Sequence, residues 1–348
     1  MVIRMKEKVI DAVHACIHTK EPMAVTIHPY EIEKHQQLNQ HHLLLMLKPE
    51  LTSIHKGVQL DRILDELLLR LDNHDVEIGA VRVISSLYLK EKKIIEKQYG
   101  MLNKISKNGL SELSDTAKKM LFFKYPEFKQ KEHFIYGGHQ FLQKYEELTS
   151  YGLELLTRNM KVDKLGAGTY AIKAEVDGEQ MLLLNSFHPC QIEWFTAPAK
   201  SIIVMECFSK KPMRMLREDF IGATDPKEAK AGSFKHMLLS EQKQFGLTNV
   251  CTRFNGIHLS PGPVEAMAGM IHYFRTPETR LTPAHTLFGQ LLKKSGFSDE
   301  SLDLLCEDVS IHSSEVPVFE LTENLNWDES LDLLTKVRND IQKHERVL

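Results

Sequence analysis

The stretch HLLLMLKPELTSIHKGVQLDRIL, residues 42–64, decides the predicted fold. It opens with a short apolar run closed by Pro49, which predicts a buried strand running into a turn. Apolar residues then recur at helical spacing and predict a helix with one buried face; they are Leu60, Ile63, Leu64, Leu67 and Leu68. A second strand is predicted for VEIGAVRVISSLYL (76–89). The start of another helix is predicted for KEKKIIEKQYGML (90–102). Strand, helix, strand, helix at these lengths predicts an α/β or α+β core.

The composition is that of an ordinary globular protein, with 348 residues, 42% hydrophobic and 26% charged. This length suits one large domain with extensions, or two domains. A formal net charge of -3 gives no electrostatic support for nucleic acid or an anionic membrane as a partner. No apolar run reaches the length of about 18 residues that a membrane helix needs. The five cysteines are spread out without a CxxC pair, so we expect a cytoplasmic protein with reduced thiols.

Three regions extend beyond the expected core. Segment 1–42 begins with apolar residues at helical spacing, so we expect an N-terminal helical extension. Its histidines are irregularly spaced and fit solvated surface better than a metal site; they are His28, His35, His41 and His42. An insertion at about 103–182 is less regular, and 275–348 predicts a helical C-terminal extension.

Within the insertion, two stretches have clear local patterns. LSELSDTAKKMLFF (110–123) predicts a helix with Ser or Asp as its N-cap. TYAIKAEVDGEQMLLLN (169–185) predicts a hairpin, because the Asp-Gly pair at 177–178 favours a tight turn. The preceding KLGAG (164–168) resembles the glycine-rich loop of protein kinases, which would make Lys173 a phosphate ligand, but no HRD or DFG follows. We therefore interpret these glycines as the turn that opens the hairpin.

A single histidine lies in the sequence NGIHLSPGP, residues 255–263. Two prolines and two glycines around His258 predict a stiff loop rather than a core element. Held there, three residues after Asn255, His258 is either a positioned nucleophile or a surface loop residue. The residues alone leave both interpretations open.

A second segment, REDFIGATDPKEAKAGSFK (217–235), gathers groups that suit a polyanion. Arg217 lies on a predicted helix, and a loop of small residues follows it. Lys227, Lys230 and Lys235 then cluster around a glycine. Guanidinium, ammonium, hydroxyl and backbone donors in one segment can bind phosphates together. A capped helix-loop-helix with solvated lysines fits the same pattern.

In chain order, these segments resemble the nucleoside diphosphate kinase family. That family places a Lys-Pro-Asp turn after its first strand, then a tyrosine helix, an arginine helix, a GxTDPxxAxxGTIR-like loop and an NxxHGSDS-like loop. The matching segments here are LKPE (47–50), IIEKQYGML (94–102), FHPCQIEWFTAPAKSIIVMECF (187–208), REDFIGATDPKEAKAGSFK and NGIHLSPG. The resemblance covers 43–101, 185–235 and 250–274. It implies a nucleoside diphosphate kinase-like domain at 43–274, interrupted by the insertion. The implied fold is an α/β (α+β sandwich), ferredoxin-like core whose antiparallel sheet is covered by helices.

The family moves the γ-phosphate of an NTP to an NDP through a phosphohistidine, so the resemblance implies that His258 is the nucleophile. Nucleoside di- and triphosphates would be the partners, and Mg²⁺ would be bound through their phosphates. The implied catalytic residues are His258, Lys48 and Tyr99; the implied nucleotide-binding residues are Lys48, Arg217, Thr224, Lys235, Asn255 and Phe187; Ser260 would complete the loop. The resemblance implies no metal ligand from the protein.

The chain departs from the family at several of these positions. Lys235 stands where the family has arginine, so a compact ammonium replaces a planar guanidinium that can donate two parallel hydrogen bonds. Arg253 is the nearby alternative donor. The glutamate that orients the family's histidine falls at Met270, whose side chain cannot accept that hydrogen bond. His258 would then need another partner. The base-stacking phenylalanine has no clear match, and Phe187 is the nearest candidate.

These departures leave three functions open. The first is a nucleoside diphosphate kinase that acts through His258. The second is a catalytically impaired nucleotide-binding or scaffolding protein on the same fold, and the third is phosphotransfer to another acceptor such as a protein. Because the family's enzymes form hexamers or tetramers, we expect a homo-oligomer, although the three added regions can replace the family's contacts.

Overall fold

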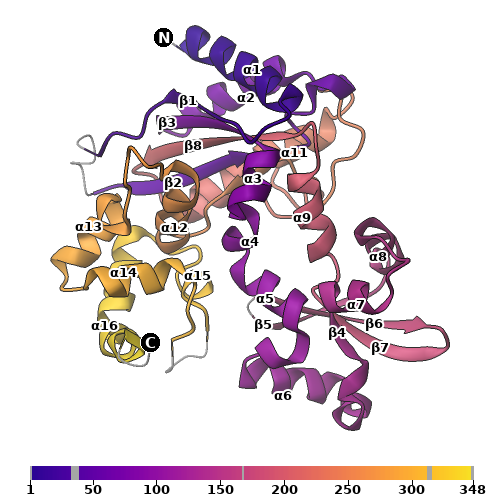
Figure 1. Ribbon diagram of the computed structural model, residues 1–348. Helices are drawn as coiled ribbons and strands as arrows, with labels where there is room; N and C mark the ends of the chain where they lie inside the picture. The colour runs from indigo at the N-terminus through magenta and orange to yellow at the C-terminus, as the bar shows by residue number, and fades with distance from the viewer. Residues whose placement is uncertain (1, 33–38, 167, 312–315, 346–348) are drawn as a thin grey trace. The chain divides into compact units, whose positions relative to one another are not determined.

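The computed structural model describes residues 2–32, 39–166, 168–311 and 316–345. The chain forms two compact units (Figure 1). Unit 1 comprises Met1–Ile94, Phe195–Val309 and Leu321–Leu348, and unit 2 comprises Ile95–Trp194 and Ser310–Glu320. The insertion predicted at 103–182 lies entirely within unit 2. No helix in the described ranges is both long enough and apolar enough to cross a membrane.

Unit 1 is built on an antiparallel sheet whose strand order is β1-β3-β8-β2-β9. Its elements are α1 (Val2–His18), β1 (Ala24–His28), β2 (His41–Leu47), α2 (Leu60–Asn73), β3 (Val76–Ser85), α3 (Ser86–Lys92), α4 (Ile94–Gln98, shared with unit 2), β8 (Ser201–Ser209), α10 (Met213–Met215), the π-helical turn η6 (Leu216–Ile221), α11 (Phe234–Ser240), β9 (Ile257–Leu259), α12 (Pro263–Phe274), α13 (Leu287–Lys294), α14 (Asp299–Cys306) and α16 (Trp327–Glu345). Without β1, the order β9-β2-β8-β3 and the sequence β2-α2-β3, β8-α11-β9 form a ferredoxin-like βαββαβ core. The α+β fold class expected from the sequence is confirmed, with helical additions.

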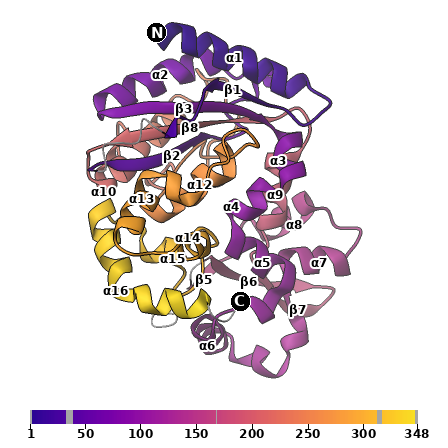
Figure 2. The same cartoon turned by 60° about the vertical axis from the view of Figure 1, so that its left-hand side comes forward.

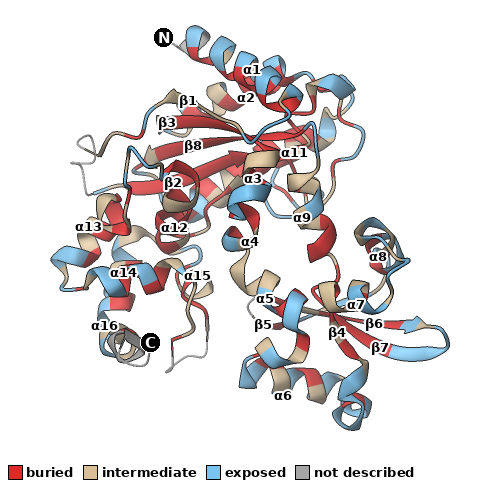
Figure 3. Cartoon of the chain, viewed as in Figure 1, coloured by how far each residue is buried: buried red, intermediate tan, exposed pale blue. Residues whose placement is uncertain are grey.

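Helices cover both faces of this sheet (Figure 2). Helices α1 and α2 pack on one face, and α12 and α13 pack against β2 on the other. All seven residues of β2 are therefore buried, which explains why residues 43–47 are apolar in succession instead of alternating. Figure 3 shows the same burial along the neighbouring strands. The predicted apolar face of α2 is the buried one, with Leu71 added and Leu68 at its margin.

The N-terminal segment contributes more than the expected helix. The helix is present as α1, and strand β1 then pairs antiparallel with β3 at the edge of the sheet. The sequence did not indicate this strand, because its residues AVTIH are only partly buried at the edge. Of the histidines considered above, His28 ends β1, His41 and His42 begin β2, and His35 lies outside the described residues. Both His41 and His42 are buried, so the prediction of solvated surface is wrong for them.

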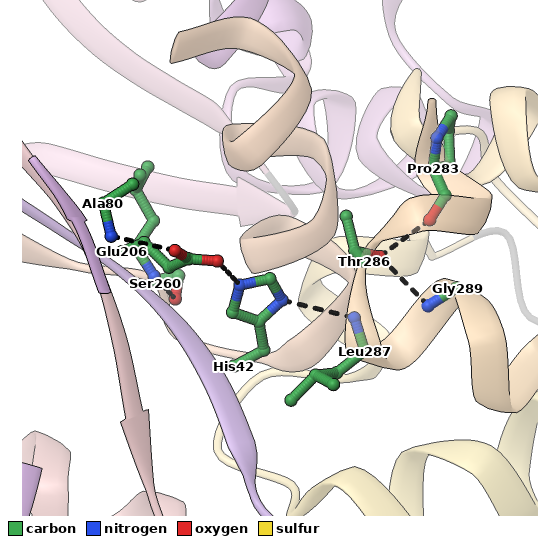
Figure 4. A network of polar contacts seen from close by, with 9 residues as sticks. His42, Ala80, Glu206, Ser260, Pro283, Thr286, Leu287 and Gly289 are labelled. Atoms are coloured by element: carbon green, nitrogen blue, oxygen red, sulfur yellow. Dashed lines mark hydrogen bonds and ion pairs between the residues drawn. The ribbon is translucent and has the colours of Figure 1, made fainter. Parts of the chain in front are cut away.

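His42 belongs to a buried polar network that joins β2, β3 and β8 to the C-terminal extension (Figure 4). Its Nε2 lies 2.8 Å from Oε1 of Glu206, and Oε2 of Glu206 accepts the backbone N–H of Ala80 at 2.9 Å. The N–H of Leu287, at the start of α13, points at Nδ1 of His42 at 3.4 Å. Because Nδ1 accepts there, the imidazole proton is on Nε2, from which it is donated to the carboxylate. The network therefore fixes both the tautomer of His42 and the docking of α13.

Unit 2 has a sheet of its own, with strand order β4-β7-β6-β5. Its elements are α5 (Gly100–Asn108), α6 (Asp115–Lys124), β4 (Ile135–Gly137), α7 (Gly138–Lys144), α8 (Ser150–Thr157), β5 (Val162–Gly166), β6 (Thr169–Val176), β7 (Glu179–Leu184), and α9 (His188–Thr196) and α15 (Val318–Leu321), which are shared with unit 1. The predicted hairpin is confirmed as β6 and β7, which are joined through the Asp-Gly pair at 177–178. The predicted helix is confirmed as α6, and the Ser114 hydroxyl caps it by accepting the N–H of Ala117.

One predicted strand ends earlier than its apolar pattern indicated. The strand expected over 76–89 stops at Ser85, and SLYL forms the first turns of α3. The Ser85 hydroxyl accepts the N–H of Tyr88 at 3.3 Å and caps that helix. Leu89 is buried as a helical residue instead. An apolar run alone does not distinguish a strand from a helix. Here the Ser85 cap decides that 86–89 is helical.

Candidate functional site

His258 lies in the middle of the short strand β9, at the edge of the unit 1 sheet. Its partner across the ladder is Met46 of β2. The expectation of a stiff loop rather than a core element is therefore wrong for His258 itself. The prolines and glycines follow it, and Pro263 opens α12. The half-buried imidazole is thus held by a strand on one side and a helix start on the other.

Ser260 extends this pairing beyond β9. Its N–H donates to the carbonyl of Leu44 at 2.9 Å, and its hydroxyl accepts the N–H of Leu44 at 3.1 Å. The Ser260 side chain is fully buried. In this structure it fixes the chain after His258 to β2.

Lys48 directly follows β2 and Asn255 lies just before β9, and the two side chains contact each other. The Lys48 ammonium donates to Oδ1 of Asn255 at 2.6 Å, and the Lys48 N–H donates to the carbonyl of Gly256 at 2.8 Å. Glu50 closes the same turn by accepting the N–H of Gly256 at 2.8 Å. Gly256 has a φ of +76°, and a Cβ there would lie 2.5 Å from Leu238, so only glycine fits. The Lys-Pro-Glu turn and the Asn-Gly turn are therefore locked together.

The segment predicted to bind phosphates joins this group through Asn255 and Lys235. The side-chain amide of Asn255 donates to the carbonyl of exposed Thr224 at 3.0 Å. The Lys235 ammonium donates to the carbonyl of Gly222 at 3.3 Å. Arg217, on the π-helical turn η6, donates from Nη2 to Oε1 of Glu323 at 3.3 Å, while its Nη1 is buried without a hydrogen-bond partner in the described residues.

Two neighbouring cations act on Lys235 in this group. Burial, together with the positive charges of Lys48 and Arg217, lowers the pKa of Lys235 to about 7. Burial also lowers the pKa of Lys48, against the opposing effect of the Glu50 carboxylate. Because the charges of Lys48 and Arg217 disfavour the charged form of Lys235, these three side chains form a site suited to a polyanion, whose negative charge would favour the charged form of Lys235.

The carboxylate nearest to His258 comes from Glu265, in the first turn of α12. Its Oε1 lies 3.1 Å from Nε2 of His258, although Nε2 is not aligned for a hydrogen bond in this structure. Met270, where the family's glutamate was expected, is fully buried in the core. Since Met270 cannot serve, the candidate for the other partner that His258 was expected to need is Glu265, about one and a half turns earlier on α12.

The remaining sequence candidates make other contacts. Tyr99 and Phe187 both belong to unit 2, where Tyr99 lies 6.4 Å from the ring of His188 and Phe187 packs edge-on against Tyr170. Arg253, the fallback donor, stacks over Phe254. Unit 1 therefore brings together Lys48, Arg217, Thr224, Lys235, Asn255, His258 and Ser260.

Two site residues were missed by sequence reasoning. Glu265 follows His258 by seven positions, and the helix start at Pro263 is a local signal that its side chain lies over the first turn. Glu323 had no such signal, because it is 106 residues from Arg217.

Neither a protein-family model nor a curated protein sequence matches the chain. Among solved structures, the chain is similar to an NDP kinase from Pyrobaculum aerophilum, with 17% sequence identity and a TM-score of 0.34. That similarity covers 69% of this chain and 98% of the other.

Proposed function

We propose that the protein is a nucleoside diphosphate kinase-like phosphotransferase that moves the γ-phosphate of an NTP to an NDP through a phosphohistidine at His258. The observation that carries the proposal is the convergence of Lys48, Arg217 and Lys235, with Lys48 hydrogen-bonded to Asn255 and Gly256 in the turn that leads into β9 and His258. Four motifs in family order and the βαββαβ strand order support it.

The geometry suggests how this chain's residues would act. The three cations would neutralise the transferring phosphates, and Asn255, held between Lys48 and Thr224, would offer a hydroxyl-binding amide. Mg²⁺ would be carried on the nucleotide's phosphates and would neutralise their charge. The negative charge of the Glu265 carboxylate, 3.1 Å from Nε2 of His258, would favour the tautomer protonated at Nε2 and leave the lone pair on Nδ1.

In the proposed reaction, Nδ1 forms a bond to the γ-phosphorus while the bond from that phosphorus to the bridging oxygen of the NDP breaks. The electron pair leaves on the β-phosphate. The same steps in reverse pass the phosphoryl group to a second NDP. Glu265 would balance the positive charge that develops on the imidazole.

Incubation with Mg²⁺ and γ-labelled ATP tests this proposal. We expect acid-labile label on the protein, which GDP removes as labelled GTP. Label that withstands GDP would favour another acceptor. Absence of label, with ADP still bound, would favour the impaired nucleotide-binding protein.

Replacing Glu265 by glutamine should reduce kcat about tenfold to a hundredfold, because the imidazolium formed on attack loses its counter-charge. The Kd for ADP should stay within about twofold, since the Glu265 carboxylate lies 3.1 Å from His258 and would act on its imidazole. Single-turnover labelling separates the effect on the rate of phosphoryl transfer from the effect on ADP binding. A purely structural role would instead change both together, and equal kcat values would exclude the assignment.

Affinity for ADP should fall as the pH rises above 7. In the free protein, the pKa of Lys235 is lowered to about 7, whereas bound phosphates favour its charged form and raise that pKa. Binding above pH 7 must therefore take up a proton, and Kd should rise by up to about tenfold for each pH unit between 7.5 and 9. Titration calorimetry in two buffers measures both the Kd and the number of protons taken up on binding. Lys235→Arg stays charged, so a profile as steep as that of the wild type would contradict this explanation.

A further inference from the structure

The phosphate-binding arginine of the candidate site is already paired with a carboxylate from the C-terminal extension. Nη2 of Arg217 lies 3.3 Å from Oε1 of Glu323, and the two side chains are 24% and 39% exposed. Arg217 has a second nitrogen, Nη1, that is buried without a hydrogen-bond partner in the described residues. A guanidinium with one end on a carboxylate and the other end unsatisfied is half of a bidentate anion site.

Glu323 is held by a segment, 322–326, that we call the strap. The N–H of Asn324 donates to the carbonyl of Pro261 at 2.8 Å. The carbonyl of Thr322 packs so closely on Gly262 that a Cβ at that glycine would lie 2.4 Å away. One side of the strap thus rests on the chain that leads from His258 into α12.

The other side of the strap is anchored to the element that carries Arg217. The side-chain oxygen of Asn326 accepts the N–H of Met213 at 2.9 Å, at the start of the helical segment that continues into η6. It also lies 3.2 Å from Nε2 of His41. Asn326 further accepts the N–H of Ser330 through its carbonyl, which ties the strap to the first turn of α16. The strap therefore bridges the His258 and Arg217 elements within unit 1.

We propose that the strap holds Glu323 on Arg217 in place of a nucleotide phosphate, so that nucleotide binding must displace this carboxylate. The inference rests on the proposed function, because it assigns Arg217 to the phosphates. A phosphate bound to both Nη1 and Nη2 needs the donor that Glu323 accepts, so the carboxylate and the phosphate compete for Nη2. Glu323 then sets the affinity of the site, and whatever moves α16 would move the strap and regulate it.

The experiment compares the full chain with Glu323→Gln. Removing a partly exposed ion pair should tighten ADP binding about twofold to fivefold, measured by calorimetry with Mg²⁺. The matched control is Glu218→Gln, which removes the same charge from the arginine helix but from a carboxylate paired with Arg214. The gain should also vanish when Arg217→Ala is present in both backgrounds.

A second readout needs no nucleotide. Phenylglyoxal modifies free guanidinium groups, and peptide mass spectrometry follows its reaction at Arg217. Glu323→Gln should speed that reaction several-fold, and Glu218→Gln should not. Unchanged modification and unchanged ADP affinity would overturn the strap proposal, as would an equal gain in Glu218→Gln. Faster modification without ADP binding in any variant would uphold the Glu323 contact and refute the proposed function.

Discussion

His258→Ala should lose phosphoenzyme formation by about a thousandfold or more, because the variant has no atom that can accept the phosphoryl group. His258 is held in place by the pairing of β9 with Met46 and by the Ser260 contacts with Leu44. Quench-flow labelling with γ-labelled ATP measures the loss directly. ADP affinity should change little, since the cations remain.

The matched control is His55→Ala, which removes an exposed histidine from unit 1 and should label like the wild type. Full labelling of the His258 variant would place the phosphoryl group elsewhere and refute the proposed mechanism. Loss of labelling in both variants would indicate damage to the fold. Circular dichroism of each variant distinguishes that case.

Glu206→Ala should destabilise unit 1 by about 3 kcal/mol, the largest effect on stability that we expect from a single polar side chain. Glu206 is 2% exposed, and it satisfies both Nε2 of His42 and the N–H of Ala80. Alanine leaves both donors buried and unpaired, and it also leaves a void between β3 and β8. Urea unfolding monitored by amide exchange of β2 reports this unit specifically.

Glu77→Ala removes an exposed carboxylate from β3 and should change stability by less than about 0.5 kcal/mol. Since His42 also accepts the N–H of Leu287, loss of Glu206 should speed amide exchange at the start of α13 as well. A destabilisation below about 1 kcal/mol, with α13 unchanged, would show that the network is dispensable.

The sequence by itself determined the local elements of this protein. The burial of the apolar residues 43–47 in β2, the apolar face of α2, the β6–β7 hairpin and the Ser114 cap all follow from signals within about ten residues. The order of motifs also singled out His258 and the cationic segment. Such features are readable because burial and hydrogen bonding leave a period or a cap in the chain itself.

Only the tertiary structure decided how these elements share a site. The contact between Glu265 and His258 depends on the direction of α12 relative to β9, and the pairing of Glu323 with Arg217 joins residues that are far apart in sequence. The His42–Glu206 pair likewise turns two residues that look like surface positions into a buried network. No periodic pattern in the sequence identifies the partner of a charged side chain, because that partner depends on how separate elements pack together. The sequence therefore supplied the groups, and the packing of the sheet, α12 and the strap decided which of them meet.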